Sequence, residues 1–147
     1  MNYTIRGAGN QDITLVKNFL GQANVSSEGI EKIVDNFLLM IDEGGNLLAT
    51  MGIERVERDG LLRSLVITPS LSQTDMLALF QRILKLAKEK EIEHLYLATN
   101  KHSSIAFFQV LGFHVVHNDH LPNHLLLSEH VQHSMKSEQA TYMKVKL

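Results

Sequence analysis

Hydrophobic and polar residues follow two different spacings along the chain, and these spacings predict its secondary structure. Short apolar runs bounded by turn residues are typical of strands, and they lie at residues 3–5, 37–41, 47–53, 61–68, 94–99, 113–116 and 140–147. Apolar residues three and four apart are typical of amphipathic helices, and they lie at about residues 12–20, 26–34, 72–91 and 103–111. Their order predicts an α+β fold in which a mixed central sheet carries helices on both faces, with residues 1–147 in one domain.

Polar turns divide the three central strands into an antiparallel meander. The first turn runs from Asp42 to Asn46 and contains two glycines. The second is expected at Asp59-Gly60, a dipeptide typical of hairpin turns. Asp12 precedes the first helical pattern and is expected to cap that helix.

Composition and charge exclude several classes of function. The chain has 14 Lys and Arg against 16 Asp and Glu, so it lacks the basic field that attracts nucleic acid. It has no Cys, which excludes disulfides, thiolate zinc sites and a Cys nucleophile. No apolar run approaches the roughly 18 residues needed to cross a bilayer, so we expect no membrane partner and a cytoplasmic location.

Three segments in the second half of the chain carry a recognisable order of motifs. The strand at 65–69 reads Leu-Val-Ile-Thr-Pro, the segment at 95–100 ends in Thr-Asn, and the segment at 104–113 closes in Leu-Gly-Phe. In these features the chain resembles the GNAT family of acyl-CoA-dependent N-acetyltransferases, and more loosely the subgroup related to N-acetylglutamate synthase and arsenic-resistance acetyltransferases. The resemblance implies the acyl-CoA N-acyltransferase fold and transfer of an acetyl group from acetyl-CoA to a primary amine of a small molecule.

The resemblance also implies which residues bind acetyl-CoA as the co-substrate. The residues that would contact its acyl and pantetheine portion are Leu65, Val66, Ile67, Asn100, Phe107 and Phe108. The backbone near Val66 would polarise the thioester carbonyl. The loop that opens the long helix would receive the pyrophosphate, and it comprises Ser72, Gln73, Thr74, Asp75, Met76 and Leu77.

This loop departs from the family pattern, which has small residues, glycine or alanine, where Asp75 and Leu77 stand. Glycine lets a pyrophosphate approach the main chain closely, whereas Asp75 adds a negative charge beside an anionic ligand. Ser72 and Asp75 also have the spacing of a capping box. Two alternatives stay open: the helix start binds the coenzyme, or it caps itself and the chain is a non-catalytic binding or regulatory domain.

A second departure is Phe108, which stands where many family members carry a Tyr that protonates the leaving thiolate. Phe cannot donate a proton, so no side-chain acid is assigned. The acceptor amine must still lose a proton to a base. Glu54 is the candidate for this base, with a solvated hairpin charge as the alternative.

Arg63 is the candidate anchor for the acceptor. It lies within an otherwise apolar strand, where an unpartnered charge is costly. Its guanidinium matches the geometry of a carboxylate, which favours an acidic amine as the substrate. The alternative is an internal ion pair of Arg63 with Glu54 or with an acid on a neighbouring strand.

Histidines are concentrated in one segment, at His114, His117, His120, His124, His130 and His133. Neutral imidazoles bind zinc, nickel or copper, which makes a metal-binding module a third alternative. No Cys or clearly placed carboxylate completes a ligand set, so no metal is expected. The sequence leaves open whether two copies form a homodimer.

Overall fold

The fold, taken from a computed structural model that describes residues 2–99, 101–117, 121–126 and 140–147, is built on a mixed sheet. The described strands form one seven-stranded sheet in the order β1-β2-β3-β4-β5-β7-β6. Their bounds are β1 Tyr3–Gly7, β2 Phe37–Asp42, β3 Leu47–Val56, β4 Asp59–Ile67, β5 His94–Thr99, β6 His114–Val116 and β7 Thr141–Lys146. Only β4 and β5 pair in parallel, and the other neighbouring pairs in this described sheet are antiparallel.

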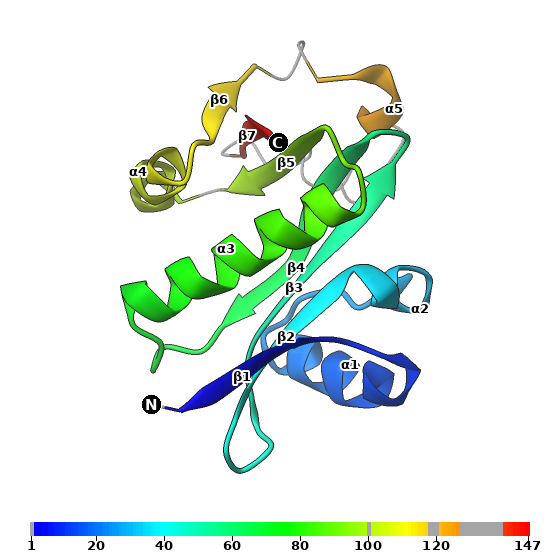
Figure 1. The fold of residues 1–147 in the computed structure, drawn as a ribbon, viewed down its shortest axis with the longest axis vertical. Coiled ribbons are helices and arrows are strands. Elements are labelled where there is room, and N and C mark those ends of the chain that lie inside the picture. The colour runs from blue at the N-terminus through cyan, green and yellow to red at the C-terminus, as the bar shows by residue number, and fades with distance from the viewer. Residues whose placement is uncertain (1, 100, 118–120, 127–139) are drawn as a thin grey trace.

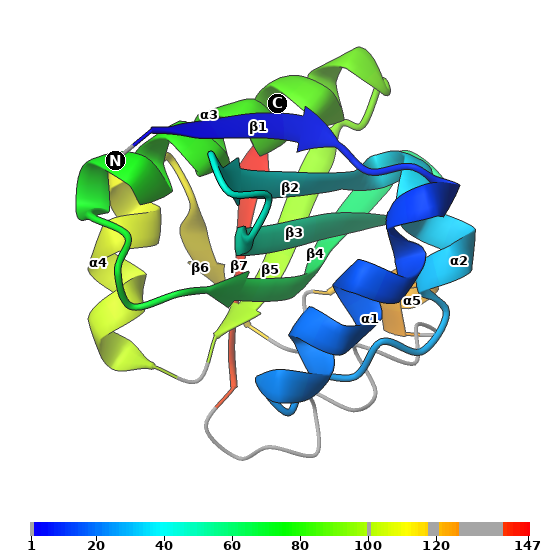
Figure 2. The ribbon, with the colours of Figure 1, turned by 90° about the horizontal axis from the view of Figure 1, so that it is seen from below.

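Helices cover both faces of this sheet, as the sequence pattern predicts (Figures 1 and 2). The described helices are α1 Ile13–Gln22, α2 Ile30–Ile33, α3 Gln73–Glu89, α4 His102–Val110 and α5 Asn123–Leu126. The α3 and α4 helices lie on one face, and α1 and α2 lie on the other. Within the described residues, none of the helices has the length and apolar character needed to span a membrane.

Each face of the sheet has its own apolar core. On one face the buried side chains of α3, spaced three and four apart at Leu79, Phe80, Ile83 and Ala87, pack against the sheet. On the opposite face Val16 and Leu20 of α1 pack with side chains of β2. Burial of a side chain of this size stabilises the fold by about 1.5–3 kcal/mol.

The prediction of a hairpin turn at Asp59-Gly60 is wrong. The turn lies two residues earlier, at Glu57, which adopts a left-handed conformation with φ 57°. Asp59 and Gly60 instead begin β4 and pair with β5. A Cβ at Gly60 would lie 2.9 Å from a methyl carbon of Ile53, so this glycine serves close packing within the sheet.

The expectation that Asp12 caps the first helix also needs correction. Asp12 ends a short 3-10 helix, and its carboxylate does not bond to the first turn of α1. It accepts hydrogen bonds from Arg6 Nη1 and Nη2, both at 2.9 Å, and from the Gly9 N–H at 2.8 Å. Asp12 thus connects the end of β1 to the start of α1 as a buried carboxylate.

This contact predicts a specific acid sensitivity. The hydrogen bonds from Arg6, and then the one from Gly9, hold the pKa of Asp12 below its usual range. A lowered folded pKa stabilises the protein above the unfolded pKa of about 3.9, and this contribution is lost as the pH falls through the folded value. We expect Asp12→Asn to lower the free energy of unfolding at neutral pH by about 1 kcal/mol. Denaturant unfolding at stepped pH should show a shallower acid loss than in the wild type, and an unchanged slope would contradict the role of Asp12.

Candidate active site

The site begins where the two parallel strands separate. β4 pairs with β5 only at Asp59, Gly60 and Leu61, opposite His94, Leu95 and Tyr96. Beyond Leu61, β4 runs on to Ile67 and β5 runs on to Thr99 without a further pair between them. Backbone N–H and C=O groups along the split therefore lack their ladder partners, and such an edge can pair with an extended ligand.

A bulge in β4 lies at this split. Two residues, Ser64 and Leu65, stand opposite the single residue Met51 of β3, because the pairing shifts between Thr50 and Gly52. Ser64 adopts a left-handed conformation with φ 57°, and its carbonyl accepts a hydrogen bond from Thr50 Oγ1 at 2.9 Å. An extra residue reverses the alternation of the side chains.

The two apolar cores show this reversal. Leu62 before the bulge and Ile67 after it both pack on the α3 and α4 face, although they are five positions apart. Val66 packs on the α1 and α2 face. Arg63 also belongs to this second side, because one of its guanidinium nitrogens reaches the carbonyl of Glu28 just before α2.

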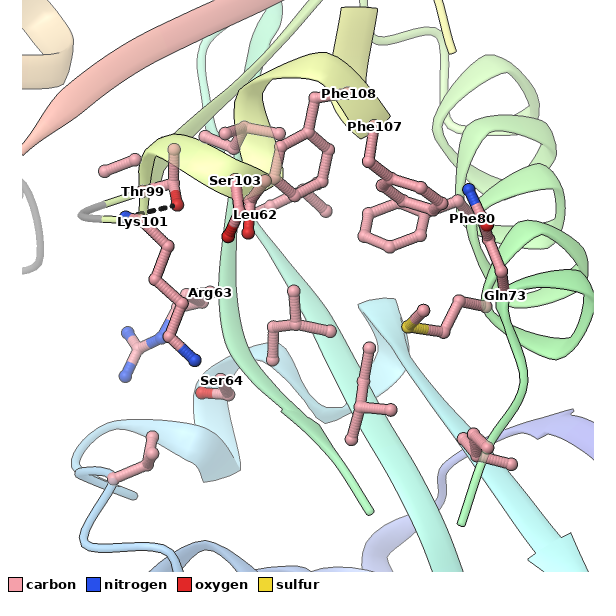
Figure 3. Close-up of a pocket in the computed structure, with 18 of the residues that line it drawn as sticks. Leu62, Arg63, Ser64, Gln73, Phe80, Thr99, Lys101, Ser103, Phe107 and Phe108 are labelled. Carbon is pink, nitrogen blue, oxygen red and sulfur yellow. Dashed lines mark hydrogen bonds between the residues drawn. The ribbon is translucent and has the colours of Figure 1, made fainter. Parts of the chain in front are cut away.

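A cleft of about 1000 Å³ passes through the split (Figure 3). Seven of the predicted site residues line it: Arg63, Leu65, Ile67, Gln73, Met76, Phe107 and Phe108. Six others, Glu54, Val66, Ser72, Thr74, Asp75 and Leu77, lie in the described chain but are not among its lining residues. Asn100 lies outside the described residues.

The wall on the α3 and α4 face is aromatic. Phe108 packs edge-to-face with Phe80, Phe107 and Phe113 at centroid distances of 5.4, 5.6 and 5.9 Å. Phe80 belongs to the buried stripe of α3, and the sequence did not indicate it as a site residue. The spacing within one helix could not reveal that Phe80 reaches the side chains of another helix.

Arg63 stands at the other end of the cleft and is held by two groups of the chain. Its Nη2 donates to the carbonyl of Glu28 at 2.8 Å, and its Nη1 lies 3.6 Å from Glu54 Oε1. The internal ion pair that the sequence left open is therefore present. The Arg63 Nε is also buried, and no hydrogen-bond partner for it exists among the described residues. This nitrogen lies in a side chain that is only 12% exposed, so leaving the donor unsatisfied is costly.

Lys101 is a site residue that sequence reasoning missed. It lies just before α4, lines the cleft, and lies at the same end as Arg63 in Figure 3. The described residues that line the cleft include these two cations and no carboxylate. Because Glu54 offsets the charge of Arg63, Lys101 supplies the net positive charge of this end, and that charge favours an anionic ligand. Only the folded arrangement brings Lys101 next to a strand that is distant in the sequence.

The first turn of α3 is capped by its own side chains, and the predicted capping box is confirmed. Ser72 Oγ accepts from the Asp75 N–H at 3.2 Å, and the Asp75 carboxylate accepts from the Ser72 N–H at 3.0 Å. Ser72 Oγ also lies 2.9 Å from Asp75 Oδ2. These contacts satisfy orphan donors of the first turn within the chain.

The two ends of an acyl-CoA molecule therefore fit the cleft unequally. Apolar walls and unpaired strand edges suit a thioester and a pantetheine arm. The start of α3, where the family resemblance places the pyrophosphate, carries the capping box instead. No Lys or Arg occurs between residues 64 and 81 to offset the charge of a diphosphate.

Part of the histidine-rich segment lies at the opposite end of β4 and β5. His124 Nε2 lies 2.6 Å from Asp59 Oδ2, and His124 Nδ1 lies 3.2 Å from Glu57 Oε2. These contacts fasten α5 to the start of β4. No group of three or more His, Asp or Glu side chains suited to a metal ion occurs in the described part of the chain. His120, His130 and His133 lie outside the described residues.

The fold is that of the GNAT acetyltransferases. N-acetylglutamate synthase from Neisseria gonorrhoeae, solved with coenzyme A and N-acetyl-glutamate, matches 100% of this chain with a TM-score of 0.76 at 18% identity. This chain spans only 35% of the length of that synthase chain. A GNAT family acetyltransferase from Staphylococcus aureus Mu50 matches with a TM-score of 0.75 and 18% identity, and 99% of both chains is covered.

At the level of sequence, the chain belongs to the same family as the uncharacterized protein YwlB from Bacillus subtilis (strain 168). The two are 37% identical over 145 residues, which cover 98% of this chain and 97% of YwlB. No known family profile matches the chain.

Proposed function

We propose that the protein is an N-acetyltransferase that moves an acetyl group from acetyl-CoA to a primary amine of a small, carboxylate-bearing molecule. The observation that carries this proposal is the separation of β4 from β5 after Leu61 and Tyr96. A split parallel pair with free backbone edges suits a pantetheine arm that binds as an added strand. The CoA bound to the synthase that shares this fold supports the same class of donor.

In the proposed reaction the amine nitrogen attacks the thioester carbonyl directly. A new N–C bond forms, the C–S bond breaks, and its electron pair leaves on the sulfur as a thiolate. Backbone N–H groups next to the Ser64 bulge would stabilise the oxyanion of the tetrahedral intermediate. The amine proton would pass to Glu54 through water, because Glu54 does not itself line the cleft. The thiolate takes its proton from solvent, since Phe108 cannot supply one.

Arg63 is proposed to bind the acceptor's carboxylate. The Arg63 side chain lines the cleft with one buried nitrogen that has no partner among the described residues, and Lys101 adds a second positive charge at the same end. The synthase from Neisseria gonorrhoeae was solved with N-acetyl-glutamate, which supports an acceptor of the amino-acid type. The close fit of a guanidinium to a carboxylate would orient the amine toward the thioester.

A panel of small amines with acetyl-CoA tests this function. We expect free thiol to be released with at least one carboxylate-bearing amine, at a rate that saturates with the amine. Calorimetric titration with acetyl-CoA or desulfo-CoA should give a binding isotherm. Absence of both binding and thiol release at millimolar ligand would end the enzyme hypothesis.

The second candidate is a non-catalytic binding or regulatory domain. The self-capped start of α3 favours this alternative, because its donors serve the chain itself. A protein of this kind would bind small anions at Arg63 and Lys101 without releasing thiol from any donor. The same titration and assay therefore separate the two candidates.

A further inference from the structure

Asp75 places a negative charge at the helix end that would otherwise attract phosphate. Hydrogen bonds from the backbone and then the hydroxyl of Ser72 hold the pKa of Asp75 below its usual range. The carboxylate is therefore ionised at neutral pH, and it takes up the interaction that the α3 dipole offers to an anion. A diphosphate that approached this helix end would meet a like charge and displaced hydrogen bonds.

The remainder of the donor side of the cleft carries no such obstacle. Phe80, Phe107 and Met76 offer apolar contact, and the edge of β4 offers backbone hydrogen bonds. Recognition along this path depends on the thioester and the pantetheine arm rather than on phosphate groups. The start of α3 therefore disfavours the diphosphate of an acyl-CoA donor, whereas the apolar lining of the cleft favours its pantetheine arm.

We infer that Asp75 is a donor-specificity residue: the cleft selects an acyl thioester by its pantetheine arm, and Asp75 removes the advantage that a diphosphate gives in a glycine-lined loop. This inference rests on the proposed function and deepens it. It predicts that a donor without the nucleotide diphosphate is used about as well as acetyl-CoA.

Two donors and one isosteric variant test the inference. Wild-type kcat/KM should differ by less than about threefold between acetyl-CoA and S-acetyl-pantetheine. Asp75→Asn should raise kcat/KM for acetyl-CoA by about tenfold and leave that for S-acetyl-pantetheine unchanged. The gain should shrink between 50 and 500 mM salt, because the repulsion is screened. Asp75→Gly restores the backbone of the family loop and should give at least the same gain.

Asp35→Asn is the matched control. It removes the same charge from an exposed position outside the cleft and should change neither donor's kcat/KM. Thermal melting of each variant checks that the start of α3 remains folded. A second readout, calorimetric binding of CoA and of pantetheine, does not require turnover. Asp75→Asn should tighten CoA binding about tenfold and leave pantetheine binding unchanged.

The outcomes separate the inference from the proposed function. A wild-type preference for acetyl-CoA above about threefold would overturn the inference while supporting the enzyme. An Asp75→Asn variant that binds CoA no more tightly than wild type would overturn it as well. If no donor releases thiol but Asp75→Asn alone gains CoA affinity, the role of Asp75 holds and the proposed catalysis fails.

Discussion

Arg63→Ala is expected to raise KM for a carboxylate-bearing amine by about 10- to 100-fold, while KM for a neutral amine of similar size changes less than about threefold. The reason is the buried guanidinium, whose Nε has no acceptor among the described residues. A hydrogen bond to a charged group contributes about 1.5–3 kcal/mol, which corresponds to this range of affinity. Steady-state kinetics with a matched pair of amines measures the effect.

Two further variants make this result specific. Arg63→Lys keeps the charge but loses the planar fork, so it should recover only part of the affinity. Arg55→Ala removes an arginine whose guanidinium bonds to the carbonyls of Glu57 and Lys90, away from the cleft, and it should change neither KM. Equal increases of KM for the acidic and the neutral amine would remove the anchor role from Arg63. In that case, the remaining role of Arg63 would be its ion pair with Glu54.

Gly52→Ala is expected to lower the free energy of unfolding by about 3 kcal/mol, a typical upper value for overpacking a core. A Cβ at Gly52 would lie 2.3 and 2.4 Å from two carbons of the Phe37 ring. Phe37 is only 1% exposed and packs in the core with Val16, Leu20 and Leu39, so moving its ring would disturb that packing. Gly52 pairs with Arg63 across the β3–β4 ladder at the bulge, so the same substitution should disturb the site. Denaturant unfolding gives the stability, and the acetyltransfer assay gives the effect on the site.

Gly21→Ala is the control for this variant. A Cβ at Gly21 meets nothing within 4 Å, and the residue lies within α1. Alanine there should stabilise the protein by up to about 1 kcal/mol, because glycine is the poorer helix former. A smaller side chain opposite the new methyl group, in Gly52→Ala combined with Phe37→Leu, should recover part of the loss. If Gly52→Ala unfolds at the same denaturant concentration as wild type, the prediction that Gly52 is needed for close packing against Phe37 is wrong.

The elements of the fold were predictable because hydrophobic spacing reports burial directly. The stripe of α3 and the closing strand β7 lie where the pattern predicts them. The turn before β4 was not predictable, because Glu57 takes a left-handed conformation that the residue type disfavours. Asp59-Gly60 carries the stronger turn signal, yet packing against Ile53 and β5 assigns these residues to a strand.

The site was predictable only in part. The capping box at Ser72 and Asp75 follows from a local spacing, and the contacts agree with it. The pairing of Arg63 with Glu54 was one of two alternatives, and a sequence cannot choose between them because the choice depends on cross-strand register. Lys101 and Phe80 were missed, since they join the cleft from a loop and a helix that the sequence separates from β4.

The sequence by itself determined the order of the strands and of helices α1 to α4, the mixed sheet, and a start of α3 that caps itself, whereas it did not indicate α5. The helices, strands and cap depend on residues within a few positions of one another, and the mixed sheet follows from the order of these elements. Tertiary structure alone decided where β4 leaves β5, which face of the sheet Arg63 occupies, and which side chains meet across the cleft. The physical reason is the bulge at Ser64: one additional residue exchanges the two faces of a strand, and only pairing with β3 reveals it.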